Sequence, residues 1–260
     1  MTEKQKAWNV SAEIRAEQKA AFANMSRKEK FNYFWEYYRF HVIVTVLVVV
    51  ILGNMIHGIV TSRSYSFYAV LINAFGLNGE VLGEEFSEMA GLDNIKQHCN
   101  IDTSSFLDIN EITSIDAALI QRLYATISAS ILDSIIADGF TFIYFADAGF
   151  FIDLRLILSE DEIKRFEDNF FYIDEAFIDA MRADPNMSMV DQQKTLEQMD
   201  QDVELRRQPD KMKTPIPVGI FLSDSPVLKD AYYGNIPVAG VIGSSNRKDE
   251  AIKFVEFLLR

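Results

Sequence analysis

Cysteine and histidine are scarce in this chain of 260 residues, which holds one cysteine and three histidines. Cys99 alone cannot form an intramolecular disulfide, and a chain of this length can fold without one in either redox environment. His41, His57 and His98 are far apart in the sequence, and no calcium loop of regularly spaced acidic residues occurs. We therefore predict no metal site and no other cofactor.

Motifs for catalysis and for phosphate binding are also missing. The sequence has no G-x-S-x-G, no H-E-x-x-H and no glycine-rich phosphate loop. Carboxylate pairs such as Asp138 and Asp147 carry little weight as an acid and a base, because the chain has 38 Asp and Glu residues. The sequence therefore predicts a protein that is not an enzyme.

Charge is absent from the long apolar stretch Phe40–Ser62. As a helix this stretch would be roughly 34 Å long, enough for a hydrocarbon core of about 30 Å. A buried soluble helix is usually shorter and carries charge on one face. A signal peptide has a shorter apolar core and a cleavage site of small residues, and about 40 residues precede the stretch here. We predict that residues 41–62 form a transmembrane helix that anchors the chain in a lipid bilayer.

The basic residues that flank this stretch predict its orientation. Those on its N-terminal side are Arg27, Lys28, Lys30 and Arg39. On the other side Arg63 stands alone as far as residue 80. Because cytoplasmic flanks carry the excess of Lys and Arg, residues 1–40 should be cytoplasmic and residues 63–260 extracytoplasmic. This arrangement predicts a single-pass protein of the cell membrane.

The approach to the apolar stretch is rich in aromatic residues. Residues 31–40 contain seven Phe, Tyr and Trp side chains, as expected where lipid headgroups meet hydrocarbon. Ser26 and Glu29 have the spacing of a capping box, which predicts that one helix begins near Arg27 and continues across the bilayer. Residues 11–25 form a further helical segment, either for a partner or as a frayed tail.

Basic residues are few in the part that follows. Residues 63–260 hold 17 Lys and Arg against 33 Asp and Glu. Such an acidic surface repels phosphates, so we predict no nucleic-acid partner.

Strand-like and helix-like patterns alternate in this acidic part, which predicts an α/β domain with largely parallel buried strands and helices on both faces. The predicted strands are 65–75, 104–110, 131–138, 215–223 and 236–243, and the predicted helices are 113–129, a segment opening at 159, and 244–260. Thr113 with Asp116 and Ser159 with Glu162 mark two helix starts. Residues 184–213 are polar and free of glycine, and form either an exposed helix or a mobile insertion.

Three stretches resemble the extracytoplasmic solute-binding proteins of bacterial import systems, which have the type II periplasmic-binding-protein fold. They are SILDSIIADG (130–139), FADAGFFIDLRLILSEDEIKRF (145–166) and IPVAGVIGSSNRKDEAIKFVEFLLR (236–260). The resemblance implies a shortened, membrane-anchored relative with a periplasmic-binding-protein-like domain. Such a relative either captures a ligand or has kept the fold and lost the ligand.

If a ligand binds, it should lie beyond the carboxyl ends of the strands. The polar residues there are Asn73, Asp138, Ser223, Ser244 and Ser245, with Tyr144, Phe145, Tyr232 and Tyr233 as candidate walls. Ser244 and Ser245 also open the last predicted helix, where free N–H groups attract anions. Each serine has the alternative role of a helix N-cap, and Asp138 that of a turn residue.

Two functions fit this pattern. The first is a membrane-tethered binding module that captures a small molecule or peptide and presents it to a transporter or sensor. The second is a scaffold that contacts other membrane or envelope proteins. A cleft with converging polar groups would favour the first, and an exposed apolar patch would favour the second.

Overall fold

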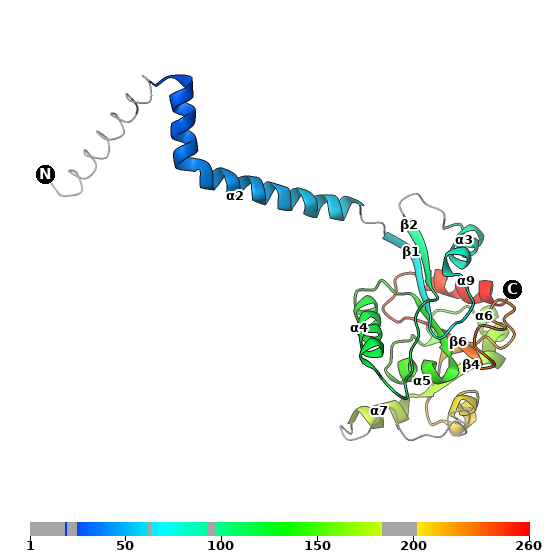
Figure 1. Ribbon diagram of the computed structural model, residues 1–260. Coiled ribbons are helices and arrows are strands. Elements are labelled where there is room, and N and C mark those ends of the chain that lie inside the picture. The colour runs from blue at the N-terminus through cyan, green and yellow to red at the C-terminus, as the bar shows by residue number, and fades with distance from the viewer. Residues whose placement is uncertain (1–18, 20–24, 62–63, 93–96, 184–201) are drawn as a thin grey trace. The chain divides into compact units, whose positions relative to one another are not determined.

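A computed structural model describes residues 19, 25–61, 64–92, 97–183 and 202–260 (Figure 1). The chain divides into two compact units, Met1–Ser62 and Arg63–Arg260, and each is described by itself.

The first unit contains one long helix, α2 (Arg27–Thr61). The predicted capping box at its start is confirmed. The backbone N–H of Ser26 donates to Oε2 of Glu29 (2.8 Å), and the backbone N–H of Glu29 donates to Oγ of Ser26 (3.3 Å). Two backbone N–H groups at the helix start thus find side-chain oxygen acceptors, which fixes where α2 begins.

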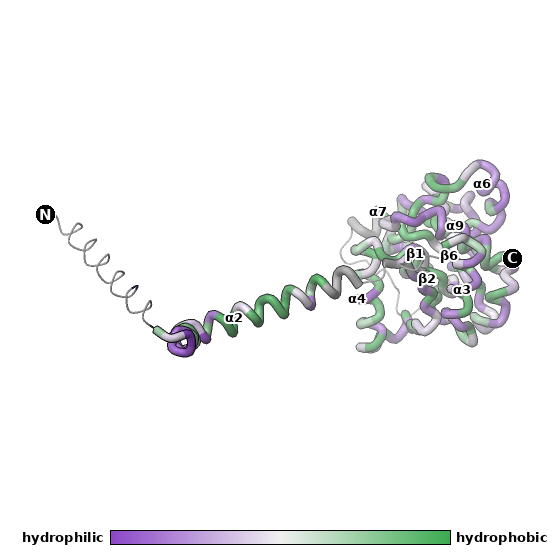
Figure 2. Tube along the Cα trace, turned by 90° about the horizontal axis from the view of Figure 1, so that it is seen from above, coloured by the Kyte–Doolittle hydropathy of each residue, from purple (hydrophilic) through white to green (hydrophobic). Residues whose placement is uncertain are grey.

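The stretch Tyr38–Ile56 of α2 has a mean hydropathy of 2.2 and, among the described residues, is the one helical segment long and apolar enough to cross a membrane. Figure 2 shows this hydrophobic colouring along the helix. Its apolar side chains are exposed, Val49 to 62% and Ile51 to 58%. The polar side chain of Asn54 donates to the carbonyl of Val50 (2.9 Å), so the helix itself satisfies part of this amide.

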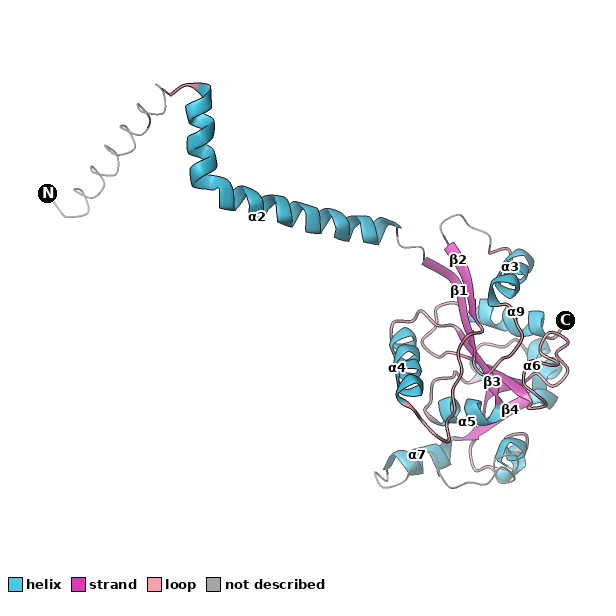
Figure 3. Cartoon of the chain, viewed as in Figure 1, coloured by secondary structure: helices cyan, strands magenta, loops and turns pink. Residues whose placement is uncertain are grey.

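The second unit is mixed α/β, and within the described residues six strands form one sheet in the order β2-β1-β3-β6-β5-β4 (Figure 3). The strands are β1 (Ser64–Leu71), β2 (Gln97–Asp102), β3 (Ser134–Asp138), β4 (Phe170–Asp174), β5 (Pro215–Phe221) and β6 (Pro237–Val241). The helices are α3 (Gly79–Ala90), α4 (Ser114–Ser128), α5 (Gly139–Asp147), α6 (Glu160–Phe166), α7 (Glu175–Ala183) and α9 (Lys248–Leu258), and the 3₁₀ turns are η1 (Leu154–Leu156), η2 (Glu167–Asn169) and η3 (Pro209–Lys211).

The expectation of a largely parallel sheet is wrong. Strand β1 pairs in parallel with β2 and β3, whereas β3–β6, β6–β5 and β5–β4 are antiparallel. The composition of a buried apolar strand is similar in parallel and antiparallel sheets, so it did not predict the antiparallel pairings. As a consequence β1, β2, β3 and β5 end at one edge of the sheet, and β4 and β6 end at the opposite edge.

The sheet has a hydrophobic core on each face, because successive side chains of a strand point to opposite sides. From β1, Phe67 packs with Phe86 of α3 and Phe254 of α9 on one face. Val70 joins the cluster of α4 and α5 on the other face. Helices on both faces are therefore confirmed. Each fully buried ring removes apolar surface worth on the order of 2–3 kcal/mol.

The predicted helices over 113–129, from 159 and over 244–260 correspond to α4, α6 and α9. Both predicted helix starts are confirmed, and each is a capping box, Thr113 with Asp116 and Ser159 with Glu162. In α9 the positions at helical spacing that we expected to face inward are buried; they are Ala251, Phe254, Val255 and Leu258.

One predicted strand is wrong, and a neighbouring strand was not predicted. Residues 104–110 form no strand, and the strand in this region is β2, seven residues earlier. The β2 sequence, QHCNID, is mostly polar, and its alternation is limited to two apolar residues, Cys99 and Ile101, so pairing with β1 reinforces a weak local preference. Of the predicted insertion 184–213, residues 184–201 lie outside the described residues, and the described remainder has a helical turn at 202–205 followed by η3.

Both outer strands of the sheet, β2 and β4, are in contact with neighbouring segments. Helix α3 lies so close to β2 that a Cβ on Gly79 would be 2.0 Å from the carbonyl oxygen of Ile101. A Cβ on Gly83 would be 3.3 Å from the carbonyl oxygen of Cys99. On the other side of the sheet, the backbone N–H of Tyr172 in β4 donates to the carbonyl of Arg206 (2.8 Å).

Candidate functional site

Two of the five predicted site residues, Asn73 and Asp138, meet where β1 and β3 end. Nδ2 of Asn73 donates to Oδ2 of Asp138 (3.0 Å), to the carbonyl of Leu107 (3.0 Å) and to Oγ1 of Thr141 (3.1 Å). Its Oδ1 accepts from the backbone N–H of Leu107 (2.8 Å). The backbone of Asn73 has φ of 61°, in the left-handed region that asparagine tolerates better than most residues. This one side chain therefore joins three segments into a fixed corner.

Asp138 is the N-cap of α5, and its Oδ1 accepts from the backbone N–H of Thr141 (2.9 Å). The side chain is buried. The helix start thus holds a carboxylate in place, and that carboxylate in turn orients the amide of Asn73.

A cavity of about 320 Å³ opens beside this corner, and we call it the Asn73 cavity. Its lining consists of Asn73, Phe75, Leu107, Asp108, Ile109, Asn110, Asp138, Phe140, Thr141, Tyr232, Tyr233 and Asn235. The volume is near the lower end for sites that bind small molecules, and aromatic rings mixed with a few placed polar groups are typical of them.

Two of the four predicted aromatic walls, Tyr232 and Tyr233, line the Asn73 cavity. Tyr232 is 3% exposed, and its hydroxyl donates to the carbonyl of Ile136 over 3.5 Å. Burial raises the pKa of Tyr232 well above its ordinary value, and the nearby carboxylate of Asp138 adds to this, so the hydroxyl keeps its proton. Tyr233 is 77% exposed and forms the outer rim.

The other two predicted walls, Tyr144 and Phe145, are not part of this cavity. Both lie in the second half of α5, away from its start, and Phe145 is fully buried in the hydrophobic core. We expected them to face a ligand because they follow a strand, but α5 places both of them nearly two turns beyond the carboxyl end of β3.

An exposed aromatic group lies at the rim of the cavity. The ring of Phe75 packs against Phe106 (centroids 4.9 Å apart) and against Tyr233 (4.7 Å). All three rings are at least 40% exposed. We call these residues the rim aromatics, and they form an apolar surface next to the site.

Ser223 follows β5 and belongs to the same edge of the sheet, but it is not part of the cavity lining. Its Oγ accepts from Nη2 of Arg207 (3.1 Å), and the guanidinium of Arg207 lies 3.6 Å above the ring of Phe221. Ser223 therefore helps to position an arginine on the surface of the core.

Ser244 and Ser245 are at the opposite edge, because β6 is antiparallel to β3. The prediction that they open the last helix is wrong, since α9 has Arg247 as its N-cap. Oγ of Ser244 donates to the carbonyl of Ile127 (2.7 Å). Oγ of Ser245 donates to Oδ1 of Asp133 (2.5 Å), so both hydroxyls are used inside the fold.

Asp133, which follows α4 and precedes β3, is the centre of that second cluster. It is fully buried, and its Oδ2 accepts from the backbone N–H of Tyr68 (2.8 Å) and from Nε of Arg247 (2.9 Å). Burial raises the pKa of Asp133, although the hydrogen bonds from Ser245, Arg247 and Tyr68 act in the other direction. The cluster connects β1, β3 and α9, and it has a structural role.

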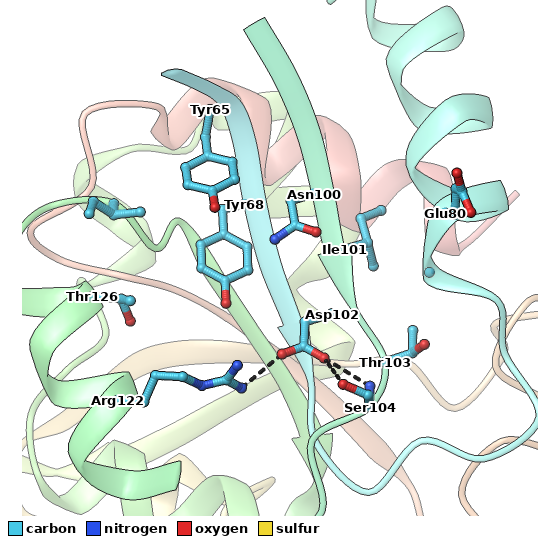
Figure 4. Close-up of a pocket in the computed structure, with 12 residues that line it drawn as sticks. Tyr65, Tyr68, Glu80, Asn100, Ile101, Asp102, Thr103, Ser104, Arg122 and Thr126 are labelled. Atoms are coloured by element: carbon cyan, nitrogen blue, oxygen red, sulfur yellow. Dashed lines mark hydrogen bonds and ion pairs between the residues drawn. The ribbon is translucent and has the colours of Figure 1, made fainter. Parts of the chain in front are cut away.

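A larger groove of about 640 Å³ lies along β2, between α3 and α4 (Figure 4). Figure 4 shows Asp102 between Arg122 and Ser104. Nη2 of Arg122 donates to Oδ2 of Asp102 (2.8 Å) and to Oγ of Ser105 (2.8 Å). Burial acts to raise the pKa of Asp102, but hydrogen bonds from Ser104, Ser105 and Arg122 outweigh it and lower the pKa. Asp102 and Arg122 of the groove thus pair with each other, and we take the Asn73 cavity, where polar groups from three segments converge, as the stronger candidate site.

The described residues contain no group of three or more His, Cys, Asp and Glu side chains placed to hold a metal ion. Cys99 is half-buried, and burial raises the pKa of its thiol to about 12, with a further contribution from Asp133. This thiol is therefore a poor nucleophile at neutral pH.

Sequence patterns missed eight of the twelve lining residues of the cavity, and Thr141 and Asp108 show why. Thr141 follows Asp138 by three residues, a spacing that indicates a helix N-cap, and this signal was present in the sequence. Asp108 lies in the segment 104–110 that was expected to be a strand, so its place in a loop at the site could not be predicted. No family model matches the chain, and no curated protein matches it either.

Proposed function

We propose that the chain is a single-pass membrane protein whose residues 63–260 lie outside the cytoplasm and capture a small ligand in the Asn73 cavity. The convergence of Asn73, Asp138 and Tyr232 from three segments on one cavity supports this proposal. Ligands of open α/β sheets bind beyond strand ends, where this cavity lies. The captured ligand would be passed to a transporter or sensor in the same membrane.

The fold proposed for this unit is a shortened relative of the periplasmic-binding-protein type. Helices on both faces of the sheet and a cavity at the carboxyl ends of β1 and β3 are in keeping with it, whereas the three antiparallel pairings are a departure. The proposed role is binding without catalysis. Asp138 is engaged as an N-cap, and the hydroxyl of Thr141 accepts from Asn73, so neither is poised as a base or nucleophile.

Ligand binding should raise the melting temperature of the full-length chain in detergent micelles. A ligand at a hundredfold excess over its dissociation constant stabilises the folded state by about 2.7 kcal/mol. We would screen sugars, amino acids, short peptides and amines by thermal unfolding. Asn235→Ala in the cavity should weaken the shift, and Asn246→Ala, an exposed asparagine at the other edge of the sheet, should not.

The scaffold is the second candidate function, and the rim aromatics favour it, because exposed apolar groups mark protein-binding surfaces. A screen without any shift, on a chain that unfolds cooperatively, would contradict ligand capture. Under the scaffold proposal, replacing Phe106 with serine would abolish cross-links to envelope proteins in intact cells while leaving the melting temperature almost unchanged.

The proposed topology can be tested by thiol labelling in intact cells. Cys99 reacts slowly because burial raises its pKa to about 12, so a single added cysteine dominates the signal. A membrane-impermeant maleimide should label the exposed position of Asp161→Cys without permeabilisation, and Lys19→Cys only after it. Labelling of Lys19→Cys in unpermeabilised cells would contradict the orientation.

A further inference from the structure

The lining of the Asn73 cavity is acidic. It contains two carboxylates, Asp108 and Asp138, and none of its lining residues is Lys, Arg or His. Asp108 is exposed, and its Oδ1 accepts from the backbone N–H of Asn110 (2.9 Å). Its Oδ2 makes no hydrogen bond to the described residues. One carboxylate oxygen at the mouth of the cavity is therefore available to a ligand.

The start of α5 would by itself favour an anion, because a helix N-terminus carries about half a positive charge. Here the carboxylate of Asp138 already occupies this position as the N-cap. Two full negative charges thus outweigh one partial positive charge. An anionic ligand would be repelled, and a positively charged group would be attracted.

Aromatic rings provide the second, independent feature. Phe75, Phe140, Tyr232 and Tyr233 all line the cavity, and the faces of such rings attract ammonium groups. Tyr232 is buried, and its hydroxyl makes a single hydrogen bond to the described residues, at 3.5 Å, which leaves lone pairs for a donor. Carboxylates together with aromatic walls are the combination that recognises organic cations.

We propose that the Asn73 cavity binds a small organic cation, a protonated or quaternary amine. Asp138 and Asp108 supply the negative charge, and the aromatic side chains enclose the apolar part of the ligand. The volume of about 320 Å³ limits the ligand to a small molecule. The excess of acidic residues across 63–260 would concentrate cations near the domain. This proposal rests on the proposed capture function and names its ligand class.

The test compares matched ligands that differ in charge, using isothermal titration calorimetry on the full-length chain in uncharged detergent. The panel consists of small amines and includes choline and cadaverine. Each amine is compared with an uncharged isostere, in which carbon replaces the charged nitrogen, and with a carboxylate of the same size. For choline the uncharged isostere is dimethylbutanol. We expect at least one amine to bind and its uncharged isostere to bind at least about tenfold more weakly. Higher salt should lower the affinity for the amine.

Variants locate the binding. Asp108→Asn removes the charge but keeps an oxygen that can accept from the backbone N–H of Asn110. It should lower the affinity for the amine about two- to fivefold at low ionic strength without changing the melting temperature. Asp168→Asn removes an exposed charge on η2, outside the cavity, and should leave the affinity unchanged. Tyr233→Leu should lower the affinity for the amine. Tyr233→Phe keeps the aromatic ring and should leave the affinity unchanged.

The outcomes separate this proposal from the one on which it rests. If an uncharged or anionic compound binds in the cavity and no amine does, the ligand class is wrong and the capture function stands. If no compound of any charge binds to a folded chain, both proposals are wrong. If an amine binds with equal affinity to Asp108→Asn and Tyr233→Leu, the site is elsewhere and the inference is overturned.

Discussion

Replacing Asp133 with alanine is expected to lower the free energy of unfolding of the second unit by about 3–5 kcal/mol, since removing one partner of a buried ion pair leaves the other uncompensated. Asp133 is fully buried, and its carboxylate accepts hydrogen bonds from Tyr68, Ser245 and Arg247. Alanine would leave three donors without their acceptor. The loss of stability in this variant would measure how much the carboxylate that links β1 to α9 contributes to the fold.

Urea unfolding followed by near-ultraviolet circular dichroism of tyrosine would measure this loss. Both tryptophans, Trp8 and Trp35, belong to the first unit, so tryptophan fluorescence does not report on the second. Glu204→Ala is the control, because Glu204 is exposed and 3.9 Å from Arg207, and such surface pairs contribute about 0–1 kcal/mol. Equal losses for the two variants would contradict the assigned role of Asp133.

A double-mutant cycle sharpens the result. Arg247→Met alone should be destabilising, because it leaves Asp133 with a buried charge and fewer partners. In the Asp133→Ala background the same change should cost much less, because the interaction is already lost. Additive losses would mean that the two side chains stabilise the fold independently, despite the 2.9 Å between them.

Replacing Phe142 with alanine is expected to cost about 3–5 kcal/mol, the range for truncating a fully buried ring. Phe142 of α5 is stacked on Phe151 with centroids 4.4 Å apart, and its ring meets Phe171 edge-on at 4.9 Å. Gly219 and Gly240 pair across β5 and β6 beneath it, and a Cβ on either would lie within 2.8 Å of the ring. Little can collapse into the space that alanine would leave, so the loss should be near the upper end.

The same urea titration measures the Phe142 variant, with Phe106→Ala as a matched truncation of an exposed ring. Phe106 is 46% exposed, and its removal should cost less than about 1 kcal/mol. Because Phe142 directly follows Thr141 in α5, the variant should also weaken ligand binding at the Asn73 cavity. A loss below 1 kcal/mol at Phe142 would show that α5 is not anchored by this ring.

Local patterns predicted α4, α6 and α9 but missed α3 and α7, and they predicted the direction of the strands poorly. Ser159 with Glu162 and Thr113 with Asp116 form their caps within four residues, so no distant contact was needed to find them. Strand direction depends on pairing partners outside the local sequence window, such as Ser134 and Val241. Nothing in a short apolar run records which way its neighbour points.

The predictions for the candidate site also succeeded or failed with the direction of the strands. Asn73 and Asp138 end strands that run in the same direction, so the rule for parallel sheets placed them together correctly. Ser244 and Ser245 end β6, which runs the opposite way, and the same rule misplaced them. Asp108 lies on a loop whose position depends on the amide of Asn73, a contact across 34 residues that no local pattern contains.

The contacts on the two outer strands have a consequence under the proposal that the chain is anchored in a membrane. Tethering confines many copies to a thin layer, where the local concentration of domains is high and open strand edges would zip together into aggregates. Here α3 blocks the free side of β2 at Gly79 and Gly83, and the segment containing Arg206 occupies a backbone donor of β4. Within the described residues these contacts occupy part of the free side of each outer strand, so they would oppose such pairing between neighbouring domains.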